Sequence, residues 1–226
     1  MQSPRRDIWT PAAGVLAAVT FIAGVLLSSA SPDSKDSDAK FIAWYADHGH
    51  RLVNIIGAYL LAFCGLFFLW FVSGLRQRLR AAEGQGGRLA SVALGGGVLF
   101  VGMLWVGAAA LVAISGGESF GGVPLLKNAD LARFLPQIGF PAILVFAAFG
   151  AIALIDATSI VIIRTGVLPR WFAWLGFVCT VVLLFGAIFI PMIALPIWLV
   201  AASVILFRLP SIEAEPVTAI PVPPPG

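Results

Sequence analysis

The amino-acid sequence predicts an all-α protein, a polytopic bundle of six transmembrane helices with both termini in the cytoplasm. The first observation is composition: 60% of the 226 residues are hydrophobic and only 11% are charged, against about 25% charged residues in an ordinary soluble domain. The second is that the apolar residues occur in long runs. A run of ~20 residues crosses the roughly 30 Å hydrocarbon core of a bilayer as a helix.

Six apolar runs fill most of the chain, and we interpret residues 1–208 as one membrane domain. The runs cover residues 8–29, 52–75, 89–115, 139–163, 171–190 and 193–207. The last two form one uncharged stretch that is too long for a single span, and Pro191 and Pro196 favour a tight hairpin between them. The tail, residues 209–226, is rich in proline and has the composition of a disordered cytoplasmic end.

The first apolar run has two interpretations. Arg5 and Arg6 precede it and Ser28-Ser29-Ala30 follows it, which is also the arrangement of a secretory signal peptide with its cleavage site. The run is slightly long for a signal peptide, so the sequence favours an uncleaved helix. Cleavage would leave five spans.

The distribution of charge predicts the orientation in the membrane. With the N-terminus inside, the inner segments hold nine basic residues, all of them arginine, whereas the outer segments hold five basic residues, including all three lysines. Basic residues are enriched in cytoplasmic loops. The arginines in the inner connectors that set this topology are Arg76, Arg78, Arg80, Arg88, Arg164 and Arg170.

The lipid bilayer is therefore the predicted partner, and the cell (inner) membrane is the predicted location. The basic residues bracket the apolar runs instead of clustering with aromatic residues, so nucleic acid is not expected to bind. The arginine-rich loop 75–88 is expected to hold the topology, and it could also contact anionic lipid headgroups at the cytoplasmic face. A homo-oligomer or a complex with another membrane protein is compatible with this composition.

The connections between the runs predict two outer segments. Residues 31–51 begin as a hydrated loop and continue as an interfacial segment that contains Trp44 and Tyr45. The second outer loop, residues 116–137, is expected to contain a short surface helix bounded by Pro124 and Pro136. On the inner side, the second span is expected to stop near Leu75.

Asp156 is the one ionisable side chain that lies clearly inside a predicted span. It precedes Arg164 by eight residues, which places it about 12 Å along the helix axis from the inner end. No basic residue lies at a comparable depth, so burial disfavours the charged carboxylate and predicts a carboxyl that is hydrogen-bonded to a neighbour. Thr180 lies at a similar depth in the next span, and Ser159 shares the helix face of Asp156.

Two interpretations of Asp156 remain open. It could bind a proton or a cation, together with Ser159 and Thr180, as intramembrane carboxyl groups do in transporters. It could instead be a polar contact that joins two helices. The sequence favours the structural interpretation, because no second acid or base lies in the spans.

Asp47, His48 and His50 form a weak candidate metal site before the second span. The intervening glycine makes the backbone flexible, so we expect these residues to cap the helix. Cys64 and Cys179 lie within apolar runs without metal-ligand spacing, and the sequence predicts no metal site and no cofactor.

The third apolar run is rich in small residues, which allow close contact between helices. The residues predicted to form such contacts are Ser91, Gly95, Gly97 and Gly102.

Two stretches, FLWFVSGLRQRLRAAEGQGGRLA and RTGVLPRWFAWLGF, resemble a family of uncharacterised actinobacterial membrane proteins. This family is akin to a broad bacterial multi-spanning family classed as a domain of unknown function. The matching features are Leu75 to Arg80 and the Leu-Pro-Arg-Trp core, Leu168 to Trp171, of Gly166 to Gly176. The resemblance covers about residues 40–208 and implies an inner-membrane bundle of about six helices, without a known reaction or ligand.

The sequence contains no GxSxG, HExxH or Walker motif. It therefore predicts a structural, regulatory or partner-binding membrane bundle without catalysis. One alternative is a small proton- or cation-linked transporter, which should have a broken helix near Asp156. Another is a lipid-acting enzyme at the outer face, which should have a cleft that joins residues 41–51 to residues 124–136. A scaffold should instead have Asp156 packed against Thr180.

Overall fold

The computed structural model describes residues 7–30, 32, 35–121, 129–185 and 190–210. All regular elements in these residues are helical, which confirms the predicted all-α class. The α-helices are α1 (Trp9–Ser28), α2 (Asp38–Ala46), α3 (His48–Glu83), α4 (Arg88–Gly116), α5 (Ala129–Pro141), α6 (Ala148–Thr165), α7 (Arg170–Leu184) and α8 (Ala194–Arg208). Three short segments of other helix types accompany them: η1 (Gly117–Gly121), η3 (Ala142–Ala147) and η4 (Ile190–Ile193).

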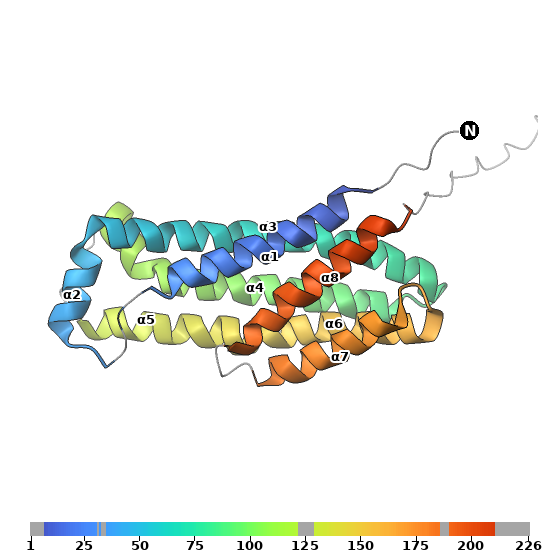
Figure 1. Ribbon diagram of the computed structural model, residues 1–226. Coiled ribbons are helices and arrows are strands. Elements are labelled where there is room, and N and C mark those ends of the chain that lie inside the picture. Colours follow the sequence, from blue (N-terminus) through green and yellow to red (C-terminus); the bar gives the residue numbers. More distant parts are fainter. Residues whose placement is uncertain (1–6, 31, 33–34, 122–128, 186–189, 211–226) are drawn as a thin grey trace, which may run out of the picture.

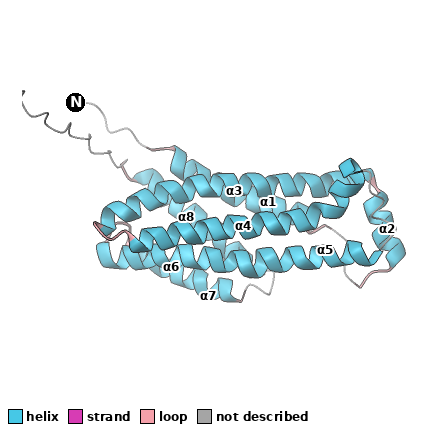
Figure 2. Cartoon of the chain, turned by 180° about the vertical axis from the view of Figure 1, so that it is seen from behind, coloured by secondary structure: helices cyan, strands magenta, loops and turns pink. Residues whose placement is uncertain are grey.

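The long helices α3, α4 and α5–η3–α6 lie side by side along a common axis (Figures 1 and 2). α1 packs along α3 and α8, and α7 packs along α6. The first apolar run is therefore an integral part of the bundle. α2 crosses one end of it, whereas α7 and α8 flank the half in which α1 begins (Figure 1).

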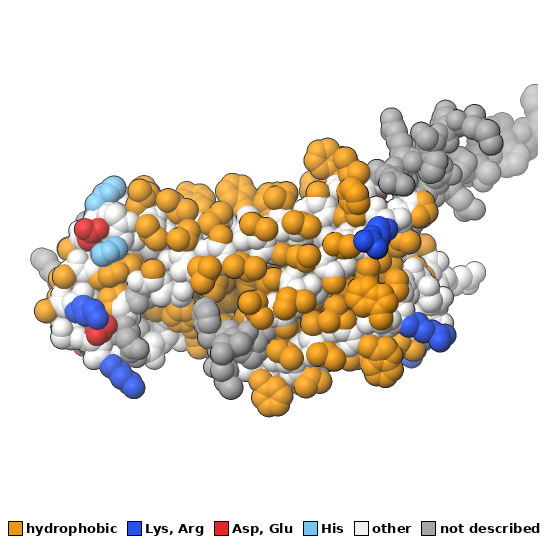
Figure 3. Space-filling model, in the orientation of Figure 1, with side chains coloured by type: hydrophobic (Ala, Val, Ile, Leu, Met, Phe, Trp, Pro, Cys, Tyr) orange, Lys and Arg blue, Asp and Glu red, His pale blue; other side chains and the backbone are white. Residues whose placement is uncertain are grey.

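Four helical segments are long and apolar enough to cross a membrane: Trp9–Ser28, His48–Glu83, Arg88–Gly121 and Arg133–Thr165. α7 and α8 are apolar but contain only 15 residues each, so each is about 22 Å long and shorter than the hydrocarbon core of about 30 Å. Hydrophobic side chains cover the middle of the molecule, and the charged side chains on the visible face lie toward its two ends (Figure 3). These features indicate a membrane protein.

The two ends of the bundle differ in charge. One end, which we call the α2 end, carries α2 and the start of α3. At the other end α3, α6 and α8 finish and α1, α4 and α7 begin. We call it the arginine end, after its residues Arg76, Arg78, Arg80, Arg88, Arg164, Arg170 and Arg208.

The fourth span differs from its prediction. The expected surface helix does not stop at Pro136: α5 continues through Pro136 and Pro141 and joins η3 and α6 without a break. Pro124 lies outside the described residues. A proline inside a helix removes one backbone hydrogen bond and crowds the carbonyl four residues earlier. The wider π-helical turn of η3 begins directly after Pro141, and this local change of pitch lets the helix continue.

The second span also differs from its prediction, because α3 does not end near Leu75. It continues to Glu83, and both Leu75 and Leu79 are fully buried. The sequence Arg76–Glu83 consists of good helix formers, so its charges end the apolar surface but not the helix. Gly84 ends α3 with a positive φ of 73°, which favours glycine, and donates its N–H to the carbonyl of Arg80.

Two carboxylates cap helix N-termini at the arginine end. Glu83, at the end of α3, accepts hydrogen bonds from the backbone N–H groups of Leu89 and Ala90 at 3.0 and 2.7 Å. Asp7 accepts from the N–H of Trp9 at 3.1 Å and from the hydroxyl of Thr10 at 2.6 Å. Both acids satisfy donors that the first turn of a helix leaves unpaired.

Replacing Asp7 with alanine should lower the free energy of unfolding by about 1 kcal/mol near neutral pH, because the cap of α1 is lost. Partial burial raises the pKa of Asp7, but the hydrogen bonds from Thr10 and Trp9 and the nearby Arg78 together hold it below the ordinary value of an aspartate. A lowered folded-state pKa gives stability that is present above the unfolded pKa and is lost as the pH falls through the folded pKa. Thermal unfolding of both proteins between pH 7 and pH 3 should therefore show a difference that shrinks in acid. A constant difference would contradict this role.

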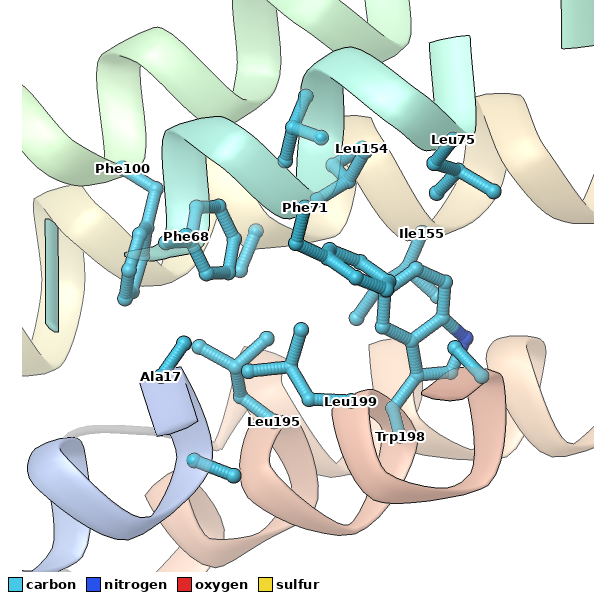
Figure 4. Close-up of a cluster of buried hydrophobic side chains, with 14 of the residues drawn as sticks. Ala17, Phe68, Phe71, Leu75, Phe100, Leu154, Ile155, Leu195, Trp198 and Leu199 are labelled. Atoms are coloured by element: carbon cyan, nitrogen blue, oxygen red, sulfur yellow. The ribbon is translucent and has the colours of Figure 1, made fainter. Parts of the chain in front are cut away.

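The core is centred on aromatic side chains from four helices. Trp198 of α8 is fully buried. It stacks on Phe172 of α7, with ring centroids 5.4 Å apart, and meets Phe71 of α3 edge-on at 6.2 Å. Phe68 packs on Phe100 of α4 at 4.4 Å. Figure 4 shows Phe71 and Trp198 pointing toward one another beside Ile155 of α6, so this cluster joins α8 to the long helices.

Candidate functional site at the α6–α7 surface

Asp156 lies on the outward side of α6. Phe149, Asp156 and Ile163 are spaced seven residues apart, so they lie along one side of the helix. The side chains of Phe149 and Ile163 are 55% and 42% exposed, and Asp156 is partly exposed between them. The carboxyl group therefore reaches the surface of the bundle at membrane depth.

Thr180 of α7 holds one oxygen of this carboxyl group. Its hydroxyl Oγ1 donates a hydrogen bond to Oδ1 of Asp156 at 2.7 Å, and Thr180 itself is buried. Asp156 is eight residues from Arg164 and Thr180 is ten residues from Arg170, so both lie about 12–15 Å from the arginine end. Within the described residues, Thr180 is the one hydrogen-bond donor to Asp156.

Ser159 does not complete this site. It is buried, and its hydroxyl has no hydrogen-bond partner among the described residues. A Cβ atom built on Gly176 of α7 would lie 2.1 Å from Ser159 Oγ. Ser159 therefore packs against Gly176, and the polar site consists of Asp156 and Thr180.

The seam between α6 and α7 continues toward the α2 end as a small apolar hollow of about 80 Å³. η3, α6 and α7 supply its walls, which include Phe149, Ile152 and Leu183. Ile152 lies one turn before Asp156. The carboxyl group is thus followed along the same surface by a hydrophobic depression.

Asp47, His48 and His50 begin α3 instead of converging on one point. The side chain of Asp47 accepts a hydrogen bond from the backbone N–H of His50 at 3.0 Å, which makes it the N-cap, and this hydrogen bond lowers the pKa of Asp47. The ring of His50 stacks on Trp44, with centroids 5.0 Å apart and planes 4° apart. The described part of the chain contains no group of three potential metal ligands.

Packing joins α2 and α5 at the position where the lipid-acting enzyme required a cleft. Arg133 of α5 forms an ion pair with Asp38 and donates a hydrogen bond to the carbonyl of Asp36. Its guanidinium group also lies 5.0 Å from the ring centroid of Phe41. The described part of the 124–136 segment is therefore in direct contact with α2; residues 124–128 lie outside the described residues.

Of the four residues predicted to form helix contacts in α4, Gly97 faces a neighbouring helix and the other three do not face one within the described residues. A Cβ atom on Gly97 would lie 2.9 Å from Val72 of α3, whereas nothing lies within 4 Å of a Cβ atom on Gly95 or Gly102. Ser91 is exposed. Consecutive residues of a helix point 100° apart, so of the three adjacent glycines, residues 95–97, the first points out of the bundle.

The topology residues all lie at the arginine end, but in different surroundings. Arg88, Arg164 and Arg170 are exposed. Arg78 donates a hydrogen bond to the carbonyl of Pro210 at 2.9 Å and lies near the carboxylate of Asp7. Arg80 packs against Gly87, and Nε of Arg76 is buried without a hydrogen-bond partner.

Comparison with protein-family models, with curated proteins and with solved structures gives no match for this chain. The resemblance to actinobacterial membrane proteins of unknown function therefore stays a prediction.

Proposed function

We propose that this protein is a multi-pass membrane protein without catalytic activity, and that its α6–α7 surface binds another transmembrane helix through Asp156. The observation that carries the proposal is the partly exposed carboxyl group at membrane depth, to which Thr180 is the one hydrogen-bond donor among the described residues.

The energies support a role beyond the contact with Thr180. An aspartate at the centre of a transmembrane helix costs about 2.5–3.5 kcal/mol on insertion scales. A hydrogen bond between transmembrane helices contributes about 0.6 kcal/mol on average and about 1.7 kcal/mol at most. The bond to Thr180 therefore offsets only part of the cost, and Oδ2 of Asp156 remains available to a partner.

The partner expected at this surface is a helix with a polar side chain at the same depth. Arginine, lysine, asparagine or a hydroxyl residue could donate a hydrogen bond to Oδ2. An apolar side chain of this partner helix would fill the hollow beside Phe149. The partner helix could belong to a different protein or to a second copy of this chain.

The arrangement in the membrane that we propose has six spans, both termini in the cytoplasm and the arginine end inward. The excess of arginine at this end agrees with the enrichment of basic residues in cytoplasmic loops. Because α7 and α8 are shorter than the hydrocarbon core, crossing it requires local thinning of the bilayer around them, which costs fractions of a kcal/mol per Å.

Photo-crosslinking in living membranes tests the proposal. A photoreactive phenylalanine analogue at position 149 should give a discrete protein adduct, because this side chain lies two helical turns from Asp156 on the same outward face. The adduct should disappear in Asp156→Leu, which removes every hydrogen bond. It should persist in Asp156→Asn, because the amide oxygen can accept from the partner while the NH2 group donates to Oγ1 of Thr180. Its mass distinguishes a second copy of this 23.8 kDa chain from another protein.

Phe63 of α3 is the matched control position, because it is 49% exposed and lies at a similar depth on another face. Its crosslinks should not respond to substitutions at Asp156. An adduct at position 149 that survives in Asp156→Leu would refute the proposal.

A proton- or cation-linked carrier is the second candidate. It is favoured by the π-helical segment η3, which interrupts the regular geometry of the helix that carries Asp156. The same variants separate the two functions. Asparagine cannot exchange a proton, so a carrier should lose its activity in Asp156→Asn and in Asp156→Leu alike, whereas partner binding should separate these two variants.

A further inference from the structure

The arginine end brings together seven guanidinium groups from five helices. α3 contributes three of them, and α4, α6, α7 and α8 contribute one each. On the face that Figure 3 shows, Lys and Arg side chains lie at this end without neighbouring Asp or Glu side chains. Because these helices all start or finish here, the positive charges lie in one layer across the end of the bundle.

The described acids at this end, Asp7 and Glu83, are both engaged at helix N-termini. The ion pairs found in the described residues, Lys40–Asp36 and Arg133–Asp38, both lie at the α2 end. Among the described residues, no guanidinium group of the arginine end therefore has a carboxylate within 4 Å. In the described part of the chain, Asp7 offsets part of the charge of Arg78, and the rest of this layer of positive charge has no carboxylate partner.

The depth of this layer matches the headgroup region of a bilayer. Trp9, Trp171 and Trp174 lie beside it at the starts of α1 and α7, and their side chains are 71%, 56% and 66% exposed. Tryptophan prefers the level of the headgroups, with its ring toward the acyl chains. The adjacent arginines are thus placed where lipid phosphates lie.

The choice of arginine also has chemical meaning. An ammonium group would set the topology equally well, yet lysine is absent from the described part of this end. A guanidinium group presents a planar fork that binds two phosphate oxygens at once and is more weakly hydrated than an ammonium group.

From the unpaired guanidinium groups, their depth and their chemistry we infer that the arginine end is a binding surface for anionic phospholipids. The guanidinium groups bind the headgroup phosphates, and the tryptophan rings contact the upper acyl chains. This inference does not depend on the proposed partner helix, because it concerns a different surface of the molecule.

Arg164 and Arg170 are the best residues to substitute. Both are exposed and lie on either side of the turn that joins α6 to α7, so their replacement should not disturb the core. Arg76 and Arg78 are partly buried and would be poorer choices. The matched control is the double substitution Lys35→Gln and Lys40→Gln, which removes the same charge at the α2 end.

The experiment is native mass spectrometry of the full chain released from nanodiscs of equal phosphatidylglycerol and phosphatidylcholine. The wild type should retain phosphatidylglycerol preferentially, and added salt should weaken this preference. Each arginine near an anionic surface contributes about 1 kcal/mol, or roughly a fivefold effect. Arg164→Gln/Arg170→Gln should therefore reduce the preference by at least fivefold, and the lysine control should leave it unchanged.

A second double variant, Arg164→Lys/Arg170→Lys, keeps the charge but loses the planar fork, and we expect its preference to lie between those of the wild type and the glutamine variant. It also provides the test if the glutamine variant fails to fold. Equal retention of the two lipids by the wild type would refute the inference. The inference would also be refuted if the glutamine variant and the Lys35/Lys40 control lost the lipid preference equally. The same holds if Arg164→Lys/Arg170→Lys kept the full preference of the wild type.

Discussion

Gly150→Ala should destabilise the protein by about 3 kcal/mol, near the upper end for overpacking of a core. α4 and α6 are in backbone contact here: a Cβ atom on Gly150 would lie 2.4 Å from the backbone nitrogen of Phe100 and 2.7 Å from the carbonyl oxygen of Gly96. Backbone atoms cannot rotate away as a flexible side chain can, so the two helices must separate. Thermal unfolding, followed by the reaction of a thiol dye with the buried Cys64 and Cys179, measures the loss.

Gly102→Ala is the matched control for this substitution. Gly102 lies on α4 as Gly96 does, but nothing lies within 4 Å of a Cβ atom placed there. Alanine has a higher helix propensity than glycine by up to about 1 kcal/mol. The control should therefore unfold at the same temperature as the wild type or above it. Equal destabilisation by both substitutions would contradict the close contact of α4 with α6.

Trp198→Ala should also cost about 3 kcal/mol. The lost volume leaves a cavity between Phe71 and Phe172, and substitutions of this size in soluble cores cost about 3–5 kcal/mol. The lower end applies, because lipid is as apolar as the core and the transfer term is small. The same thiol assay should report early exposure of Cys179 as α8 loosens from α7.

Trp174→Ala is the control for this prediction, because the side chain is 66% exposed on α7. It removes an identical side chain from the surface and should change stability by less than about 0.5 kcal/mol. If the two variants unfold alike, Trp198 does not anchor α8 in the core.

Thr180 could be associated with Asp156 from the sequence, because the rise of a helix is fixed. Once Arg164 and Arg170 mark the same end of two antiparallel helices, counting residues places both side chains at a common depth. Counting residues gives the depth of a side chain in the bundle but not the direction in which it points. The outward position of Asp156 and the contact of Ser159 with Gly176 depend on how α6 and α7 are rotated against each other, which the tertiary packing decides.

The features that sequence reasoning missed depend on contacts between distant residues. A proline such as Pro136 usually ends a helix, but here the packing of α5 against α4 and the wide turn of η3 sustain it. Similarly, the sequence places Glu83 within an arginine-rich loop and does not show what it contacts. Its role as the cap of α4 requires the turn after Gly84 to fold the chain back.

The shortness of α7 and α8 gives the molecule an unequal cross-section along its axis. Both helices flank the half nearer the arginine end (Figure 1), so more described helices lie in that half than in the opposite one. Where α8 begins, an open hollow of about 240 Å³ lies between Phe21 and Val25 of α1 and Met192 and Pro196. A body that is wider in one leaflet displaces more lipid there than in the other. It should therefore fit best into a bilayer that curves, with the convex side toward the arginine end.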